Sequence, residues 1–247
     1  MPSLLAMDII DIARSLQLSE LDPTPKTVKE WLTAEYAGRP KGGFDYDPAN
    51  RVVFDAYRGG HTAQSAVDYC LENGNPAGRR QNALAVKCVM PHILKHPSRC
   101  YRIGNSMVAI GRFSGKTTYA RIKAPLLRVE SSTKAYVVMT GFRMSHRPQR
   151  LEVDFACSVA RDVFAQGVYS EADFEYLNAG PSFSNPKRRF LRVAHGVERA
   201  RYDRDEIDYY LDIFVKGLAL MAKAGADVSA PSFRGYRLVD PDRPRFL

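Results

Sequence analysis

Three strand-like segments in the middle of the chain constrain its fold more than any other feature. They alternate apolar and polar residues, and they cover residues 106–113, 117–130 and 135–144. Short turns at residues 114–115 and 131–133 separate them. Turns of this length join neighbouring strands that run in opposite directions. The sequence therefore predicts an antiparallel three-strand meander.

Helical patterns flank this meander on both sides. Apolar residues at helical spacing predict helices over residues 4–18, from Thr24 or Thr27 to Tyr36, 62–72, 79–90, from Pro148 to Gly167, and from Asp203 or Asp205 to Gly225. Further strands are expected at residues 51–57, 174–177 and 188–194. The predicted fold class is α+β: the meander lies within a mixed sheet flanked by helices and preceded by a helical N-terminal extension.

The expected organisation is one main domain with two flanking segments. We assign residues 1–60 to a helical N-terminal segment and loop, 61–228 to an α/β core domain, and 229–247 to an irregular tail. No apolar run is long enough to span a membrane, and the N-terminus lacks a basic leader. The four cysteines show no paired spacing, which favours free thiols in a reducing compartment. A cytoplasmic protein without membrane partners is expected.

The charge distribution indicates an anionic partner. Residues 73–150 contain fifteen arginines and lysines but a single acid, Glu130, which gives this stretch a net charge of +14. The whole chain carries +9, so the remaining residues sum to −5. An ordinary surface mixes both signs. Arginine, whose planar fork matches phosphate, outnumbers lysine here, and aromatic residues are interleaved. DNA or RNA is therefore the expected partner, with an acidic protein as the alternative.

The strand predicted at residues 117–130 indicates where nucleic acid would bind. Strand alternation places Arg121 and Lys123 on one face and Ala120, Ile122 and Ala124 on the other. Flanking helices can cover only the apolar face, so the basic face is expected to stay open. We predict that nucleic acid contacts the basic residues on and beside this face, namely Arg112, Lys116, Arg121, Lys123, Arg143 and Arg147. The next candidates are Lys187, Arg188, Arg189 and Arg192.

Two motifs are typical of ligand-binding sites, but a purely structural interpretation fits each of them better. The segment from Gly111 to Thr117 resembles a phosphate-binding P-loop, but it is one residue short between its glycines and precedes a strand, so a hairpin turn is favoured. Cys88, His92, His96 and Cys100 are spaced four apart, as zinc ligands on one helix face would be. Prolines at 91 and 97 interrupt that helix, so no metal is predicted.

The acidic residues offer no complete catalytic site. Glu152 and Asp154 would share a face on a strand, but the longer helical pattern places them on the solvated side of a helix. No serine, histidine and acid are spaced as a nucleophilic triad. The catalytic residues, if there are any, remain unknown from the sequence.

The order helix, three-strand meander, helix, strand, strand, helix over residues 62–224 resembles the core of PD-(D/E)XK, restriction-endonuclease-like proteins. In that family the second core strand carries a metal-binding aspartate and the third an acid-x-lysine pair. Here the third strand offers Thr140 and Phe142, and Glu130 lies at the far end of the second. Because two carboxylates are needed to hold Mg²⁺ against a scissile phosphate, the resemblance implies a degenerate member that binds rather than cuts.

Three functions follow from these patterns. The first is a non-catalytic nucleic-acid-binding protein that needs no cofactor. The second is a metal-dependent nuclease, using Mg²⁺, or another enzyme acting on phosphate-containing substrates through an unrecognised site. The third is an interaction module that docks an acidic protein.

Overall fold

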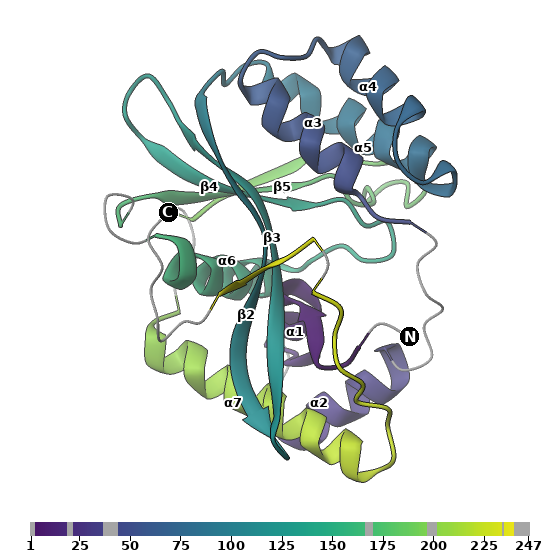
Figure 1. Cartoon of the computed structure of the whole chain (residues 1–247), viewed down its shortest axis with the longest axis vertical. Coiled ribbons are helices and arrows are strands. Elements are labelled where there is room, and N and C mark those ends of the chain that lie inside the picture. Colours follow the sequence, from purple (N-terminus) through teal and green to yellow (C-terminus); the bar gives the residue numbers. More distant parts are fainter. Residues whose placement is uncertain are drawn as a thin grey trace.

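A mixed β-sheet separates two groups of helices in this protein (Figure 1). The computed structural model describes residues 3–18, 22–36, 44–165, 170–196, 202–233 and 235–239. Within these ranges the helices are α1 (Ile9–Ser15), α2 (Pro25–Trp31) continued by a π-helical turn (Leu32–Tyr36), α3 (Asp47–Tyr57), α4 (Ala63–Glu72), α5 (Pro76–Ile93), α6 (Arg150–Phe164) and α7 (Arg204–Lys223). The predicted α+β class is confirmed.

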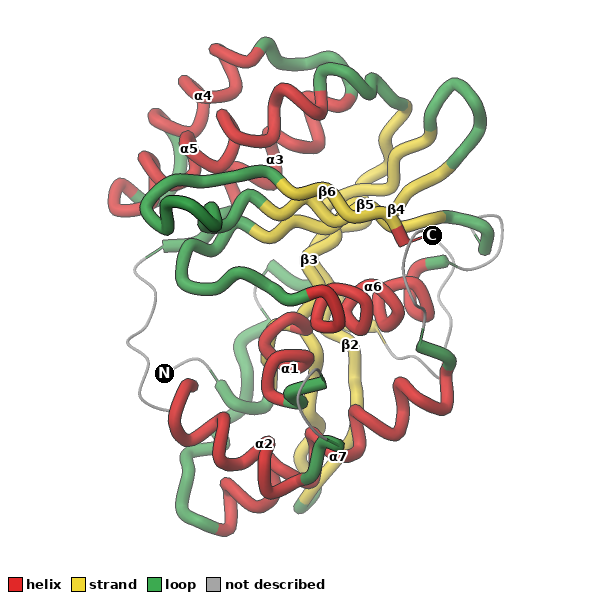
Figure 2. Tube along the Cα trace, turned by 180° about the vertical axis from the view of Figure 1, so that it is seen from behind, coloured by secondary structure: helices red, strands yellow, loops and turns green. Residues whose placement is uncertain are grey.

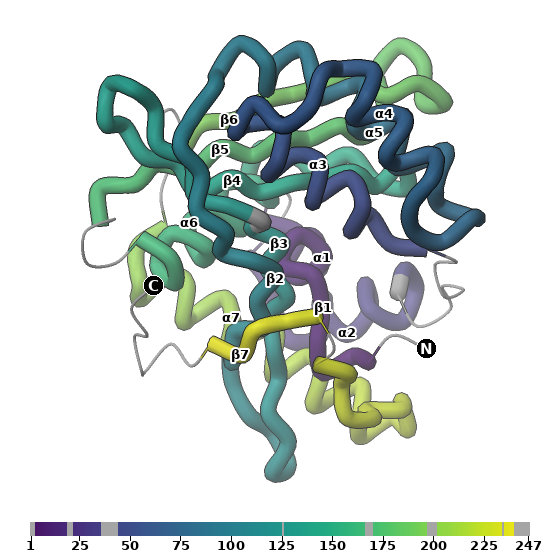
Figure 3. The backbone as a smooth tube through the Cα atoms, turned by 45° about the horizontal axis from the view of Figure 1, so that its top comes forward, coloured from purple at the N-terminus to yellow at the C-terminus, as the bar shows by residue number. Residues whose placement is uncertain are grey.

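The central meander is confirmed as well. The strands are β1 (Ala6–Asp8), β2 (Arg99–Phe113), β3 (Lys116–Val129), β4 (Ala135–Gly141), β5 (Asp173–Asn178), β6 (Arg192–His195) and β7 (Arg237–Val239). Antiparallel pairing joins β2, β3 and β4. The sheet order is β6-β5-β4-β3-β2-β7, with β4 and β5 parallel and β1 beside β3. In Figure 3 the short strands β1 and β7 lie against the middle of the long β2–β3 ribbon.

Each face of the sheet carries its own hydrophobic cluster. One cluster joins α1, α2, α6 and α7 to the sheet and includes Ile12, Phe155 and Phe214, all fully buried. The other joins α3, α4 and α5 and includes Tyr57 and Met90. Figure 2 shows α3–α5 on one side of β4, β5 and β6 and α1 and α6 on the other. The first sixty residues contribute to both clusters, so the proposed boundary at residue 60 stays an interpretation.

The strand expected at residues 51–57 is wrong. This segment is the second half of α3, which starts at Asp47 with a proline in its first turn. The β-branched Val52 and Val53 suggested a strand, but with Ala56 and Tyr57 they form one buried helical face against α5. Tertiary burial thus overrides the local strand preference of these residues. Residues 37–43, within the segment assigned to the N-terminal helices and loop, lie outside the described residues.

Smaller differences concern the ends of elements. The first expected helix begins with a strand, because Ala6–Asp8 pairs with β3 before α1 starts. Helix α5 continues through Pro91 to Ile93, and β2 starts seven residues earlier than its alternation indicated. Thr62 and Asp203 cap α4 and α7 as expected. Gly167, the expected end of α6, lies outside the described residues.

Strand β3 changes its partner across Pro125. Before Pro125, β3 pairs with β1 as far as Arg121. After Pro125 it pairs with β4, starting at Leu126. Its register with β2 stays continuous here, and the irregularity lies instead between Ala109 and Gly111. The change of neighbour falls at Pro125, a residue that has no backbone N–H to donate to the ladder.

Three further expectations can be compared with the structure. The segment after Gly111 is a hairpin turn, with Ser114 and Gly115 at positive φ, and a strand follows it. The four cysteines are free thiols. Among the described residues, no helix combines the length and apolarity needed to cross a membrane.

Candidate nucleic-acid interface

The basic face predicted on β3 is partly covered and partly neutralised. Lys123 Nζ lies 3.7 Å from Asp8 Oδ2, and the same oxygen accepts from Arg143 Nη2 at 3.3 Å. Arg143 Nη1 also donates to Asp11 at 2.6 Å. The expectation that this face stays open is wrong, because β1 and α1 bring two carboxylates against it.

The pKa values of Asp8 and Lys123 show that each depends on the charge of the other. Burial alone would raise the pKa of Asp8, but the charges of Arg143, Lys123 and Arg121 outweigh it and lower that pKa. Burial lowers the pKa of Lys123, and Asp8 offsets only part of this effect. Lys123 and Arg143 therefore stabilise the attachment of the N-terminal strand rather than presenting free charge.

The six predicted contact residues do not form one surface. Arg112 and Lys116 flank the β2–β3 turn, where Arg112 Nε donates to Thr117 Oγ1 and Lys116 Nζ donates to the backbone oxygen of Val228. Burial raises the pKa of Tyr236, and the charge of Arg121 at the middle of β3 offsets part of this effect. Arg121, Lys123 and Arg143 come together around Asp8, and Arg147 lies in a neighbouring cavity.

Arg128, from the same basic stretch, is fully internal. Its guanidinium donates to Glu175 Oε2 at 2.6 Å and to Glu130 Oε1 at 2.6 Å. Tyr57 and His92 also contact the Glu175 carboxylate. This network connects α3 and α5 to strands β3 and β5, so Arg128 has a structural role.

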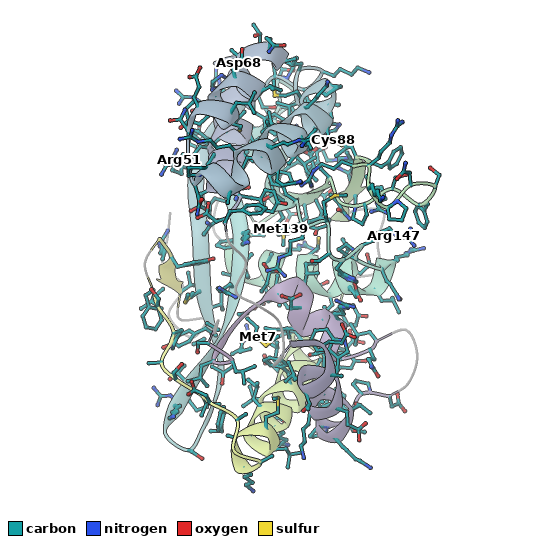
Figure 4. All side chains as sticks on the ribbon, turned by 90° about the vertical axis from the view of Figure 1, so that its right-hand side faces the viewer. Met7, Arg51, Asp68, Cys88, Met139 and Arg147 are labelled. Carbon is teal, nitrogen blue, oxygen red and sulfur yellow. The ribbon has the colours of Figure 1, made fainter. Side chains whose placement is uncertain are left out.

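Arginines also gather around a cavity of about 690 Å³ beside the start of α6. We call it the arginine groove. Basic and aromatic side chains from four separate segments line it: Arg14, Trp31, Arg147, Arg150, Phe183 and Arg192. Figure 4 places Arg147 at the outer edge of the molecule, whereas Met7 and Met139 lie inside.

Arg147 and Arg192 hold their charges differently from Arg128. The Arg147 guanidinium lies 3.3 Å and the Arg192 guanidinium 5.2 Å from the centre of the Phe183 ring. Arg192 Nη2 donates to the backbone oxygen of Pro181 at 3.3 Å. Within the described ranges, neither guanidinium has a carboxylate within ion-pair distance. Burial and the charge of Arg147 both lower the pKa of Arg192.

A second arginine fixes the loop that carries Phe183. Arg189 Nη1 donates to the backbone oxygens of Phe142 and Ala179 at 2.6 and 2.7 Å. Its Nη2 donates to Tyr46 and Gln81 at 2.9 and 3.0 Å. Of the second basic group, Arg189 is therefore structural, Arg192 lines the arginine groove, and Lys187 and Arg188 are exposed.

The first two acids of α6, Glu152 and Asp154, lie inside the protein. Glu152 accepts from the Gln149 backbone N–H at 2.8 Å and contacts His146 Nε2 at 2.7 Å. Asp154 is 1% exposed and lies 3.6 Å from Arg150 Nε. The helix is as expected, but its predicted solvated side is wrong, because α1 and α7 also pack against α6. Both carboxylates serve the helix and its neighbours.

The candidate zinc ligands do not share one face. Helix α5 ends at Ile93, so His96 and Cys100 lie beyond it. His92 contacts Glu175, and Cys100 Sγ lies 3.5 Å from the backbone oxygen of Ser98. Across the described parts of the chain, no three His, Cys, Asp or Glu side chains are grouped to hold a metal ion.

Another cavity is larger but electrostatically closed. It has a volume of about 770 Å³ and lies between β2, α6 and α7. Two arginines line it. Arg112 donates to Thr117, and Arg204 pairs with Asp162 and with Asp208, the latter at 2.9 Å. An anion beside Arg204 would compete with two carboxylates. The arginine groove is also lined by an acid, Glu152, but that carboxylate contacts His146 and the Gln149 N–H and is not within ion-pair distance of Arg147 or Arg192.

Sequence patterns missed half of this groove. Arg14, Trp31 and Phe183 lie in segments read as a helical extension and a loop, far from the basic stretch. The one available signal was the loop from Pro181 to Arg192, where an aromatic residue precedes a basic run. Nothing in the sequence indicated that α1 and α2 would bring Arg14 and Trp31 to the same cavity.

Comparisons with known proteins give little guidance. No family model matches the chain, and no curated protein matches it. Among solved structures, the crystal structure of SSO0001 has a TM-score of 0.33 at 11% identity and covers 70% of this chain and 74% of that one. A candidate exonuclease from Eubacterium rectale has a TM-score of 0.34 at 10% identity, covering 90% and 82%. At these scores, what the site does has to be inferred from its own residues.

Proposed function

We propose that this protein binds nucleic acid through the arginine groove. The observation that carries the proposal is the pair Arg147 and Arg192, two arginines that lie over the same Phe183 ring and have no carboxylate partner among the described residues. Phosphate accepts two parallel hydrogen bonds from a guanidinium and supplies the missing negative charge. Arg14 and Arg150 line the same cavity but pair with Glu35 and Asp154 at 3.7 and 3.6 Å, so Arg147 and Arg192 supply its unpaired charge.

The groove replaces the β3 face as the proposed binding surface. Arg143 and Arg147 of the predicted set lie beside or in it, as does Arg192 of the second set. We also propose that this chain is a degenerate member of the PD-(D/E)XK group. The element order supports it. At the positions of the family's acid and lysine, however, β4 has Thr140, which donates to Asn50, and a buried Phe142 follows the end of the strand.

The test is a titration of fluorescent DNA and RNA oligonucleotides at low and moderate salt. Binding should weaken with salt, because each phosphate contact releases counterions. Arg147→Ala and Arg192→Ala should each reduce the salt slope by about one. The matched control is Arg58→Ala, since Arg58 is an exposed arginine that also lies over a phenylalanine, Phe54, at 5.5 Å.

Two results would overturn the proposal. One is the absence of binding to every probe at low salt, after which the acidic-protein alternative leads. The other is an equal loss of affinity in all three variants, which would mean that only net charge matters.

A further inference from the structure

Phe183 is an exposed aromatic ring on a rigid support. Its side chain is 71% exposed, the highest fraction among the large apolar residues of the described chain. The loop beneath it is held by the four hydrogen bonds of Arg189. A backbone bond from Ser182 to Arg188 at 2.8 Å and a bridge between Pro181 and Arg189 close the loop. The ring is therefore presented to solvent by an ordered turn.

The surroundings of Phe183 favour a planar, negatively charged ligand. An exposed ring invites contact with another flat apolar surface, and Arg147 and Arg192 supply the positive charge beside it. A second aromatic residue, Trp31, lines the same cavity under the guanidinium of Arg14 at 5.3 Å. A nucleotide combines both features, a flat base and a phosphate, within one ligand.

Base-paired nucleic acid cannot use this ring. In a duplex, each base face is stacked on its neighbours, and only the base edges and the phosphates are accessible. Single strands expose base faces, and aromatic platforms beside basic grooves bind them with little sequence preference.

Building on the proposed function, we infer that the arginine groove takes single-stranded nucleic acid with one base stacked on Phe183. Arg147 and Arg192 then contact the adjoining phosphates. Duplex of the same sequence should bind more weakly, through its phosphates alone.

The experiment compares three probes, namely a fluorescent single strand, its duplex, and an abasic strand that keeps the phosphates without bases. Phe183→Ala should weaken single-strand binding by roughly five- to a hundred-fold, the range expected for one base stack. It should leave abasic binding unchanged, and Phe183→Trp should retain affinity. Phe190→Ala is the matched control, since Phe190 is another phenylalanine of this region and is 55% exposed.

The fluorescence of Trp31 offers a second measurement of single-strand binding in the groove. Trp31 is the single tryptophan of the chain, so its emission should change when a single strand binds wild-type protein. The inference is overturned if Phe183→Ala and Phe190→Ala behave alike, if abasic and normal strands lose affinity equally, or if duplex binds as tightly as single strand. Failure of wild-type protein to bind any probe would instead overturn the proposed function, and this inference with it.

Discussion

Arg128 and Arg147 lie in the same basic stretch, yet they have opposite environments. Arg128 is 1% exposed and donates to two carboxylates. Arg147 lies on an aromatic ring beside a second arginine. Both count equally in the net charge of the sequence, but only Arg147 has charge left for a partner. The comparison teaches that a basic stretch marks where phosphate could bind only after internal ion pairs have been subtracted.

The largest expected effect is on the internal side of this comparison. Arg128→Met should lower the free energy of unfolding by about 3–5 kcal/mol, because Glu175 stays buried without its main partner. Urea unfolding followed by circular dichroism measures the loss. Arg147→Met is the control and should change stability by no more than about 0.5 kcal/mol. Equal losses in the two variants would remove the distinction between the two arginines.

The same network predicts a loss of stability in acid. Burial alone would raise the pKa of Glu175, but hydrogen bonds from His92, Arg128 and Tyr57 and the charge of Arg128 lower it to about 2, below its ordinary value of 4.5. A carboxyl with a lowered pKa in the folded state stabilises the protein above its unfolded pKa. Up to about 3 kcal/mol should therefore be lost as pH falls from 4.5 to about 2.

Unfolding in urea across this pH range tests that loss. Tyr57→Phe removes one of the bonds to Glu175, so its acid-induced loss should be smaller than that of wild type. A stability that stays flat between these pH values would show that Glu175 has an ordinary pKa in the folded protein.

Substitution of Lys123 should reduce stability by less than substitution of Arg128 and by more than substitution of Arg147. The Lys123 side chain is half-buried and pairs with Asp8, so Lys123→Met should cost about 1 kcal/mol of stability, the upper range for a partly exposed pair. The salt dependence of nucleic-acid binding should not change. A reduced salt slope with normal folding would return the binding surface to the β3 face.

The smallest effect is expected at the tip of the β2–β3 hairpin. Arg112→Ala and Lys116→Ala remove exposed charges, so stability should stay within about 0.5 kcal/mol of wild type. Affinity for oligonucleotides should also be unchanged, as measured in the same titration. Weaker binding in these variants would mean that the predicted six-residue surface extends to the hairpin after all.

The fold followed from local patterns more fully than the site did. Short turns and alternation defined β2, β3 and β4, because these features depend on neighbouring residues. The segment 51–57 failed because its burial against α5 depends on residues thirty positions away. The site required knowledge of which acids meet which bases. Asp8 reaches Lys123, and Glu175 reaches Arg128, through pairings that no local pattern specifies.

The place of β1 has a consequence for the order in which the chain can fold. Ala6 pairs with Tyr119, more than a hundred residues later. During synthesis the first strand therefore emerges long before its partner, and Leu4, Met7 and Ile9, all buried in the finished protein, lack their packing surface until then. Pairings so distant along the chain form slowly. The N-terminal strand should be among the last elements to join the sheet, and the ion pairs of Asp8 would form only at that step.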